Sequence, residues 1–250
     1  MAQIGRLTLD KMGYSMPVDA PAYQAPPFHY RNAQAISIKF ETDLDAALDA
    51  LPAPLELIEP ATANLSFYWY PFTTFGPYHE AILRLYAQHE GKRLTYIHQT
   101  FVDTEPPMLA GREIWGFPKK LASPKVAHEG DVVVCTLHYG SVLCVCATMG
   151  FKHRELDPAP LLKALARPNF MIKIIPHVDC TPRICELVRY YMEDVTVKGA
   201  WAGPAAIQLF DHALCDVARL PVREVVSATH YVTDLTLGLG EVVFDYLKDA

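Results

Sequence analysis

The sequence predicts a β-rich α+β fold, a mainly antiparallel and closed or nearly closed β-barrel or cone with a few short helices. Three observations predict it. Strand-like stretches outnumber helical ones, they do not alternate with helices as βαβ units do, and 20 prolines scattered over 250 residues favour many short elements. A hydrophobic fraction of 51% supplies a core,. No linker or composition shift divides the chain, so we expect one domain over residues 1–250.

Strand patterns, either alternating or rich in β-branched and aromatic residues, recur along the chain. They cover residues 36–41, 65–72, 94–102, 131–136, 141–148, 170–175, 184–191, 207–210 and 222–237. Tyr139-Gly140 predicts a hairpin turn between two of them. Residues 78–89 fit both a helical and a strand period, because Ala81, Leu83, Leu85 and Ala87 also alternate. The stretch is therefore left open between helix and strand.

Helices are few and short. Thr42-Asp43 predicts the N-cap of a helix that ends near Pro52, and Asp157-Pro158 predicts the start of a second that closes before Pro168. Residues 244–247 suit a short terminal helix, and residues 1–33, rich in Pro, Tyr and Ala, predict an extended arm lying on the body of the protein.

Charge and composition exclude several partners. The 22 basic and 28 acidic residues give a net charge of −6, without a basic run that would attract nucleic acid,. No stretch approaches the roughly 20 apolar residues of a membrane helix, so we expect no membrane partner. Six cysteines without metal-site spacing are interpreted as buried small hydrophobic residues in a reducing cytoplasm,.

Common catalytic motifs are absent, including the dinucleotide-binding, phosphate-loop, serine-hydrolase and zinc-protease patterns,. Of the ten histidines, His153 and His212 stand in suggestive surroundings, but a hydrogen-bonded structural role is the more common one,.

The segment GREIWGFPKKLASPK over residues 111–125 contains the most suggestive chemistry. Lys119 and Lys120 follow an apolar group, and on a strand or extended loop one of them faces inward,. Burial and a neighbouring cation both lower the pKa of an ammonium group, and a neutral amine attacks carbonyl carbon to form a Schiff base. Taken alone, two adjacent lysines are most often solvated surface charge.

The chain resembles the acetoacetate decarboxylase family over nearly its whole length. The similar segments are residues 53–60, 111–125, 147–153, 167–176, 180–187, 201–213 and 220–230, and PKK after GRE is the most specific of them. The resemblance implies a β-rich cone or barrel. It also implies a cytoplasmic homo-oligomer that uses no metal or organic cofactor and takes a small keto acid as substrate.

The resemblance also implies the catalytic residues. Lys119 matches the Schiff-base lysine and Lys120 its cationic neighbour. Arg31, in FHYRN, resembles the family's arginine, and Glu80, in YHEAI, the carboxylate that works with it.

Aromatic residues Phe28, Phe117 and Trp115 are expected at the substrate pocket. A second family carboxylate has no counterpart here, since no Asp or Glu occurs between residues 59 and 80 and Leu65 stands in its place. Hydroxyl groups lie close by in the sequence, on Ser66, Tyr68 and Tyr70.

The sequence thus predicts a decarboxylase that converts acetoacetate or a related β-keto acid to a ketone and CO2 through a Schiff base. Two alternatives remain open. One is a Schiff-base aldolase or dehydratase acting on 2-oxo acids, which the missing carboxylate favours. The other is a non-catalytic barrel that binds a small ligand.

Overall fold

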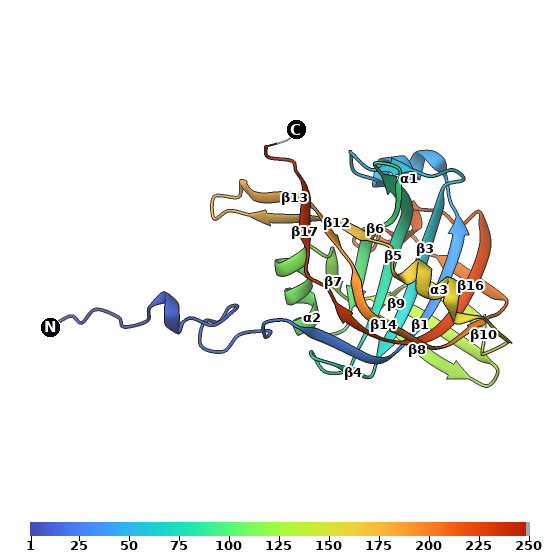
Figure 1. Cartoon of the computed structure of the whole chain (residues 1–250), viewed down its shortest axis with the longest axis horizontal. Helices are drawn as coiled ribbons and strands as arrows, with labels where there is room; N and C mark the ends of the chain where they lie inside the picture. The colour runs from blue at the N-terminus through green and yellow to red at the C-terminus, as the bar shows by residue number, and fades with distance from the viewer. Residues whose placement is uncertain (249–250) are drawn as a thin grey trace.

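A computed structural model describes residues 1–248 as two β-sheets with three short helices (Figure 1). The strands are β1 (Phe28–Glu41), β2 (Glu56–Leu57), β3 (Thr62–Tyr70), β4 (Phe72–Thr73), β5 (Tyr78–His89), β6 (Lys92–Val102), β7 (Lys119–Leu121), β8 (Ser123–Glu129), β9 (Val132–Tyr139), β10 (Val142–Gly150), β11 (Arg154–Glu155), β12 (Asn169–Pro176), β13 (Pro182–Tyr190), β14 (Met192–Ala202), β15 (Ala205–Leu209), β16 (Glu224–Leu237) and β17 (Glu241–Asp245). The helices are α1 (Leu44–Ala50), α2 (Glu105–Ala110) and α3 (Pro158–Leu165), with helical turns η1 (Leu9–Lys11), η2 (Gly111–Trp115) and η3 (Val217–Arg219).

The larger sheet has 13 strands in the main order β11-β14-β16-β1-β3-β5-β6-β12-β13-β17, and the smaller has the order β15-β10-β9-β8. Nearly all neighbours are antiparallel; β6 pairs in parallel with β7 and β12. Within residues 1–248 no pairing joins β11 to β17, so the large sheet is open. The β-rich α+β class is confirmed, whereas the closed barrel is wrong because the two end strands do not meet.

The large sheet buries a different set of side chains on each face. One face packs against the small sheet in the main core, where β1, β3 and β5 contribute Ile36, Ile38, Leu65, Phe67 and Leu83. The other face carries a second, aromatic cluster that includes Tyr30, Tyr70, Tyr78, Phe117 and Tyr190. Since successive strand residues point to opposite faces, neighbouring residues on one strand serve the two cores.

Most of the expected elements are confirmed, including the hairpin at Tyr139-Gly140, where Gly140 has a φ of 62°. The helix α3 begins as expected, with the Asp157 side chain accepting a hydrogen bond from the N–H of Ala159 at 3.0 Å. The ambiguous residues 78–89 form strand β5. The expected terminal helix over residues 244–247 is wrong, because Phe244 pairs with Leu187 as part of β17.

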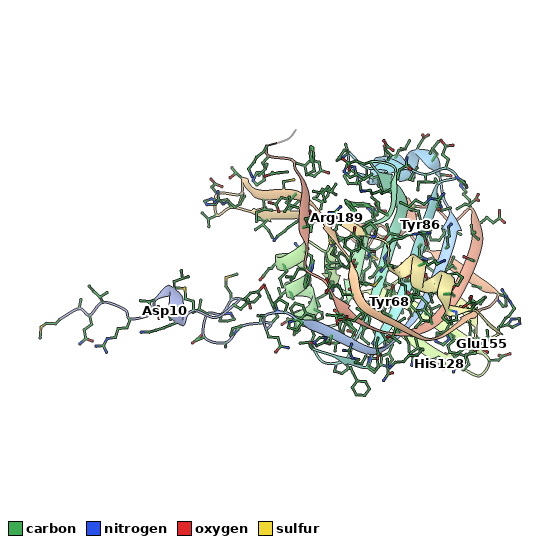
Figure 2. The ribbon with its side chains drawn as sticks, viewed as in Figure 1. Asp10, Tyr68, Tyr86, His128, Glu155 and Arg189 are labelled. Atoms are coloured by element: carbon green, nitrogen blue, oxygen red, sulfur yellow. The ribbon has the colours of Figure 1, made fainter. Side chains whose placement is uncertain are left out.

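The N-terminal arm differs from the expectation. It is shorter, because β1 begins at Phe28, and its first residues extend away from the body instead of lying on it (Figures 1 and 2, Asp10). Ile4 and Leu9 are 94% and 85% exposed, so they gain no burial within their own chain. No helix among residues 1–248 is long and apolar enough to cross a membrane.

Near the junction of the two sheets lies a buried histidine, His230 of β16. It is 2% exposed, and neither ring nitrogen has a hydrogen-bond partner among the described residues. The rings of Trp201 and Phe151 lie 5.3 Å and 5.5 Å away. Burial, and then the positive charges of His128 and Lys152, lower the pKa of His230 to about 4.

We expect His230→Phe to reduce the acid sensitivity of the fold. An unfolded histidine has a pKa of about 6.5, so between pH 6.5 and 4 the unfolded state binds more protons and stability falls as the pH falls. Phenylalanine keeps the ring packing without titrating. Urea unfolding at pH 7 and pH 4.5 should show a loss of stability smaller by roughly 2–3 kcal/mol in the variant than in the wild type. His98, whose pKa burial also lowers to about 4, should leave part of the dependence in place. Equal losses in both proteins would contradict this account.

Candidate active site

Lys119 reaches its position through a tight sequence of turns. Helix α2 has Pro106 and Pro107 in its first turn and continues into the π-helical turn η2, which ends at Trp115 and is capped by Gly116. Gly116 has a φ of 88°, and a Cβ there would meet Lys173 at 2.4 Å, so only glycine fits without rearrangement,. The chain then enters β7, where Lys119 pairs with Thr100 of β6.

The amine of Lys119 meets a carboxylate inside the protein. Its Nζ lies 2.8 Å from Oε1 of Glu80, and the two side chains are 6% and 5% exposed. Glu80 lies on β5, on the same face as Tyr78 and Ile82, because residues two apart on a strand point the same way,. A buried ion pair of this kind holds a proton donor and a proton acceptor in contact, away from bulk water.

Around this pair lies a cavity of about 50 Å³. A single water needs roughly 10–15 Å³ of such space, so there is room for a compact molecule of a few heavy atoms. The lining is Tyr30, Ala33, Tyr68, Tyr70, Glu80, Ile82, Arg84, Phe117, Lys119, Leu165, Tyr190, Met192, Tyr231, Thr233, Leu235 and Leu237. Aromatic and aliphatic side chains dominate it, and the Phe117 ring centre lies 5.1 Å from the Lys119 amine.

The cavity tyrosines are neutral hydrogen-bond donors. Burial first, and then the nearby Glu80 carboxylate, raises the pKa of Tyr30 and of Tyr70 above the usual phenol value. The hydroxyl of Tyr78 donates to that of Tyr30 at 3.2 Å. These hydroxyls therefore keep their protons at neutral pH, and those of Tyr30 and Tyr70, which line the cavity, can contact a bound molecule.

Lys120 lies outside the cavity, contrary to the expectation of a cationic neighbour. The two lysines are adjacent on β7 and point to opposite faces, Lys119 buried and Lys120 exposed,. The amine of Lys120 donates to the carbonyl of Leu214 at 2.8 Å.

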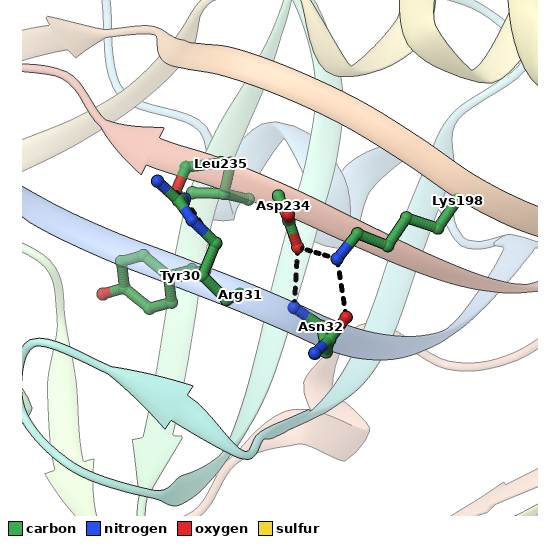
Figure 3. Close-up of polar contacts among 6 residues, drawn as sticks. All are labelled: Tyr30, Arg31, Asn32, Lys198, Asp234 and Leu235. Carbon is green, nitrogen blue, oxygen red and sulfur yellow. Dashed lines mark hydrogen bonds and ion pairs between the residues drawn. The ribbon is translucent and has the colours of Figure 1, made fainter.

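Arg31 does not reach the cavity either. From Tyr30 to Ala33 strand β1 advances three residues while β16 advances two, from Leu235 to Thr233. This bulge turns Arg31 outward, and its guanidinium donates to the carbonyls of Tyr30 and Leu235 at 2.9 Å and 3.1 Å (Figure 3).

The bulge is held by a polar cluster that the sequence did not reveal. Asn32 has a φ of 56°, a left-handed conformation that asparagine tolerates better than most residues,. Its N–H donates to Asp234 at 2.8 Å, and Lys198 contacts both the Asn32 side chain at 2.6 Å and Asp234 at 2.7 Å (Figure 3).

Of the expected pocket aromatics, Phe117 lines the cavity, while Phe28 and Trp115 lie in the apolar cluster behind it. The Trp115 indole N–H donates to the carbonyl of Gly238 at 2.8 Å. Leu65 faces the main core, on the opposite face of β3 from the cavity, so it is not a site residue. Tyr68 and Tyr70 of the same strand do line the cavity.

Sequence reasoning missed Arg84, which lines the cavity from β5. A signal was present, because the alternation of Ala81, Leu83 and Leu85 on one face implies that Glu80 and Arg84 share the other. The two histidines singled out earlier lie elsewhere; His212 accepts hydrogen bonds from the N–H groups of Leu214 and Cys215. Among the described residues no cluster of three or more His, Cys, Asp or Glu is placed to hold a metal ion.

A lysine–carboxylate pair buried in an apolar cavity is typical of enzyme sites in which a lysine amine reacts with a carbonyl compound. Residues 15–247 match the model of the acetoacetate decarboxylase (ADC) family. The chain is 50% identical over 240 residues to acetoacetate decarboxylase 3 of Mesorhizobium japonicum, covering 96% of this chain and 93% of that protein. It is 51% identical over 238 residues to acetoacetate decarboxylase 1 of Bradyrhizobium diazoefficiens, covering 95% of each. The crystal structure of acetoacetate decarboxylase from Legionella pneumophila matches with a TM-score of 0.90 at 39% identity, over 99% of this chain and 100% of that one. The chain therefore belongs to the acetoacetate decarboxylase family, a family of enzymes.

Gly111 tests the dependence of the site on the position of the Lys119 side chain. A Cβ at Gly111 would lie 2.8 Å from Cδ and 2.9 Å from Cε of Lys119. We expect Gly111→Ala to fold, because a flexible side chain is what must move, and to displace the amine from Glu80. Since displacements near 1 Å cost up to about 100-fold in rate, activity should fall at least about 10-fold while the melting temperature changes little. Unchanged activity in a folded Gly111→Ala protein would contradict the placement of Lys119.

Proposed function

We propose that this chain decarboxylates acetoacetate, or a closely related β-keto acid, through a Schiff base on Lys119. The observation that carries the proposal is the Lys119–Glu80 contact of 2.8 Å inside an apolar cavity. Membership of the acetoacetate decarboxylase family supports the same reaction.

The first step requires a neutral amine. Glu80 takes a proton from Lys119, and the free amine attacks the ketone carbon of the substrate. The carbinolamine that results loses water, whose second proton comes from Glu80, and leaves a protonated imine. The surrounding Phe117 and Tyr78 rings keep bulk water away from this exchange,.

The protonated imine makes the carbon–carbon bond to the carboxylate breakable. The electron pair of that bond moves toward the imine nitrogen, the carboxylate departs as CO2, and an enamine remains. Because the enamine is neutral, the step avoids a free enolate anion, and the apolar lining suits a reaction in which charge disappears.

Protonation of the enamine carbon completes the reaction. A tyrosine hydroxyl such as Tyr30, or Glu80 after it has taken up a proton from water, supplies the proton; hydrolysis of the imine then releases the ketone and the free lysine, and the proton consumed comes from solvent. Burial and the Glu80 carboxylate raise the pKa of Tyr30. Its hydroxyl is therefore still protonated when the enamine forms and can donate that proton to the enamine carbon,.

We expect Lys119→Ala to abolish CO2 release from acetoacetate, because no other amine lines the cavity within the described residues. Lys120→Ala should retain activity to within about 3-fold, since its side chain is exposed on the other face of β7. Borohydride reduction in the presence of acetoacetate, followed by peptide mass mapping, should place the adduct on Lys119 in both the wild type and Lys120→Ala.

Three outcomes would overturn the proposal. Absence of any adduct with a keto acid would leave a non-catalytic binding protein. An adduct and a condensation product from pyruvate plus an aldehyde, without CO2 from acetoacetate, would favour the aldolase alternative. Full activity of Lys119→Ala would remove the lysine from the mechanism.

We also propose that the chain forms a homo-oligomer and acts in the cytoplasm. The exposed apolar residues of the N-terminal arm, such as Ile4 and Leu9, support contact with a second copy, which would bury them,. All six cysteines are free thiols, which suits a reducing compartment,. Light scattering on the full chain measures the number of copies.

A further inference from the structure

A second hollow adjoins the cavity, and we refer to it as the outer funnel. It has a volume of about 460 Å³ and is lined by residues that include Lys39, Glu59, Arg93 and Arg167. Five residues line both spaces and form the neck between them: Tyr68, Arg84, Leu165, Met192 and Tyr231. Tyr86 lies in the outer funnel and Tyr68 at the neck; both are labelled in Figure 2. Arg84 therefore lies where the two spaces adjoin.

The charge of the outer funnel is opposite to that of the whole chain. The chain has a net charge of −6, yet four cations and one carboxylate line this hollow: Lys39, Arg84, Arg93, Arg167 and Glu59. A cleft lined by charge of one sign raises the local concentration of ions of the other sign. The outer funnel therefore favours the entry of small anions.

Arg84 is the cation at the neck, and it has no anionic partner among the described residues. Its guanidinium donates to the hydroxyls of Ser66 at 3.2 Å and Tyr68 at 3.1 Å, both uncharged. No ion pair among residues 1–248 includes it, although a guanidinium has five N–H donors that match a carboxylate in bidentate geometry,. A partly buried cation with unused N–H donors can bind an anion from outside the chain.

Arg84 also lies on the same strand and face as Glu80. They are four positions apart on β5, about 13 Å between Cα atoms, and both side chains point into one cavity that also holds the Lys119 amine. This cavity therefore offers a keto acid a cation for its carboxylate and an amine for its ketone.

We propose that Arg84 recognises the carboxylate of the substrate and selects keto acids over neutral ketones, an inference that rests on the proposed function. Arg31, whose guanidinium is bonded to backbone carbonyls outside the cavity, does not take this part. Because the carboxylate loses its charge as CO2 forms, the contact with Arg84 is strongest before the bond breaks. It therefore stabilises bound substrate more than the transition state.

The test is a split between KM and kcat. Arg84→Met removes the charge and keeps an apolar chain; we expect the KM for acetoacetate to rise about 10- to 100-fold, while kcat stays at the wild-type value or rises. Arg84→Lys should recover part of the loss. Arg154→Met is the matched control, because Arg154 is exposed and lines neither the cavity nor the outer funnel; its KM should change less than about 3-fold.

A neutral probe separates recognition from structural damage. In pentane-2,4-dione a methyl ketone replaces the carboxylate of acetoacetate. The dione condenses with a lysine amine, losing water. Arg84→Met should react with it at the wild-type rate, since the probe carries no charge for Arg84 to hold. Slower labelling of Lys119 in Arg84→Met would show that Arg84 positions the amine and would overturn the proposal. A folded Arg84→Met protein with an unchanged KM, whether or not its kcat falls, would also overturn the proposal.

The same probe distinguishes failure of this inference from failure of the proposed function. Bound acetoacetate should slow the labelling of Lys119 by the dione. This protection reports substrate binding and does not require the substrate to be decarboxylated. If the wild type releases no CO2 but its protection requires Arg84, the decarboxylase proposal fails and the carboxylate site stands. If CO2 is released and Arg84→Met is protected at the same acetoacetate concentration as the wild type, the carboxylate site fails and the decarboxylase proposal stands.

Discussion

The ion pair between Lys119 and Glu80 is the contact on which the rest of the site depends. Either charge alone in an apolar cavity costs several kcal/mol, so the cavity accepts one only with the other at 2.8 Å. The two residues come from strands on either side of β6. Thr100 of β6 lies opposite both Ile82 of β5 and Lys119 of β7, so the register of three strands sets the distance between the charges.

Strand alternation then decides which residues join the pair. Even-numbered residues of β5 face the cavity and odd-numbered ones the main core, so Glu80 and Arg84 come to the site together while Leu83 does not. On β1 the bulge reverses this parity between Tyr30 and Ala33. The extra residue of the β1 bulge therefore leaves the guanidinium of Arg31 outside the cavity. The alternation of side chains on β5 places the guanidinium of Arg84 inside it.

The sequence predicted which residues lie at the site better than it predicted where side chains point and how the sheet ends. Family resemblance predicted Lys119, Glu80 and Phe117 as site residues, and the structure places these three side chains around one cavity. Arg31 was misplaced because its direction depends on a bulge that Lys198 and Asp234 stabilise from distant strands. The open sheet was missed for a related reason, because whether β11 and β17 meet depends on accumulated twist and curvature and not on any local pattern.

Separating Arg84 from the Lys119–Glu80 pair also resolves a conflict in the chemistry of decarboxylation. A cation that gripped the carboxylate where the bond breaks would stabilise the reactant and raise the barrier, because the product CO2 has no charge to hold. Arg84 therefore serves the capture and initial binding of the anion, and the carbon–carbon bond breaks once the ketone has reacted with the amine among the aromatic rings. Arg84 and Glu80 are four positions apart on β5, so cations line the neck and outer funnel while aromatic rings surround the amine. A protein with a net charge of −6 thus takes up an anion through a positively lined entrance, and the anion loses its charge as CO2 forms in an apolar interior.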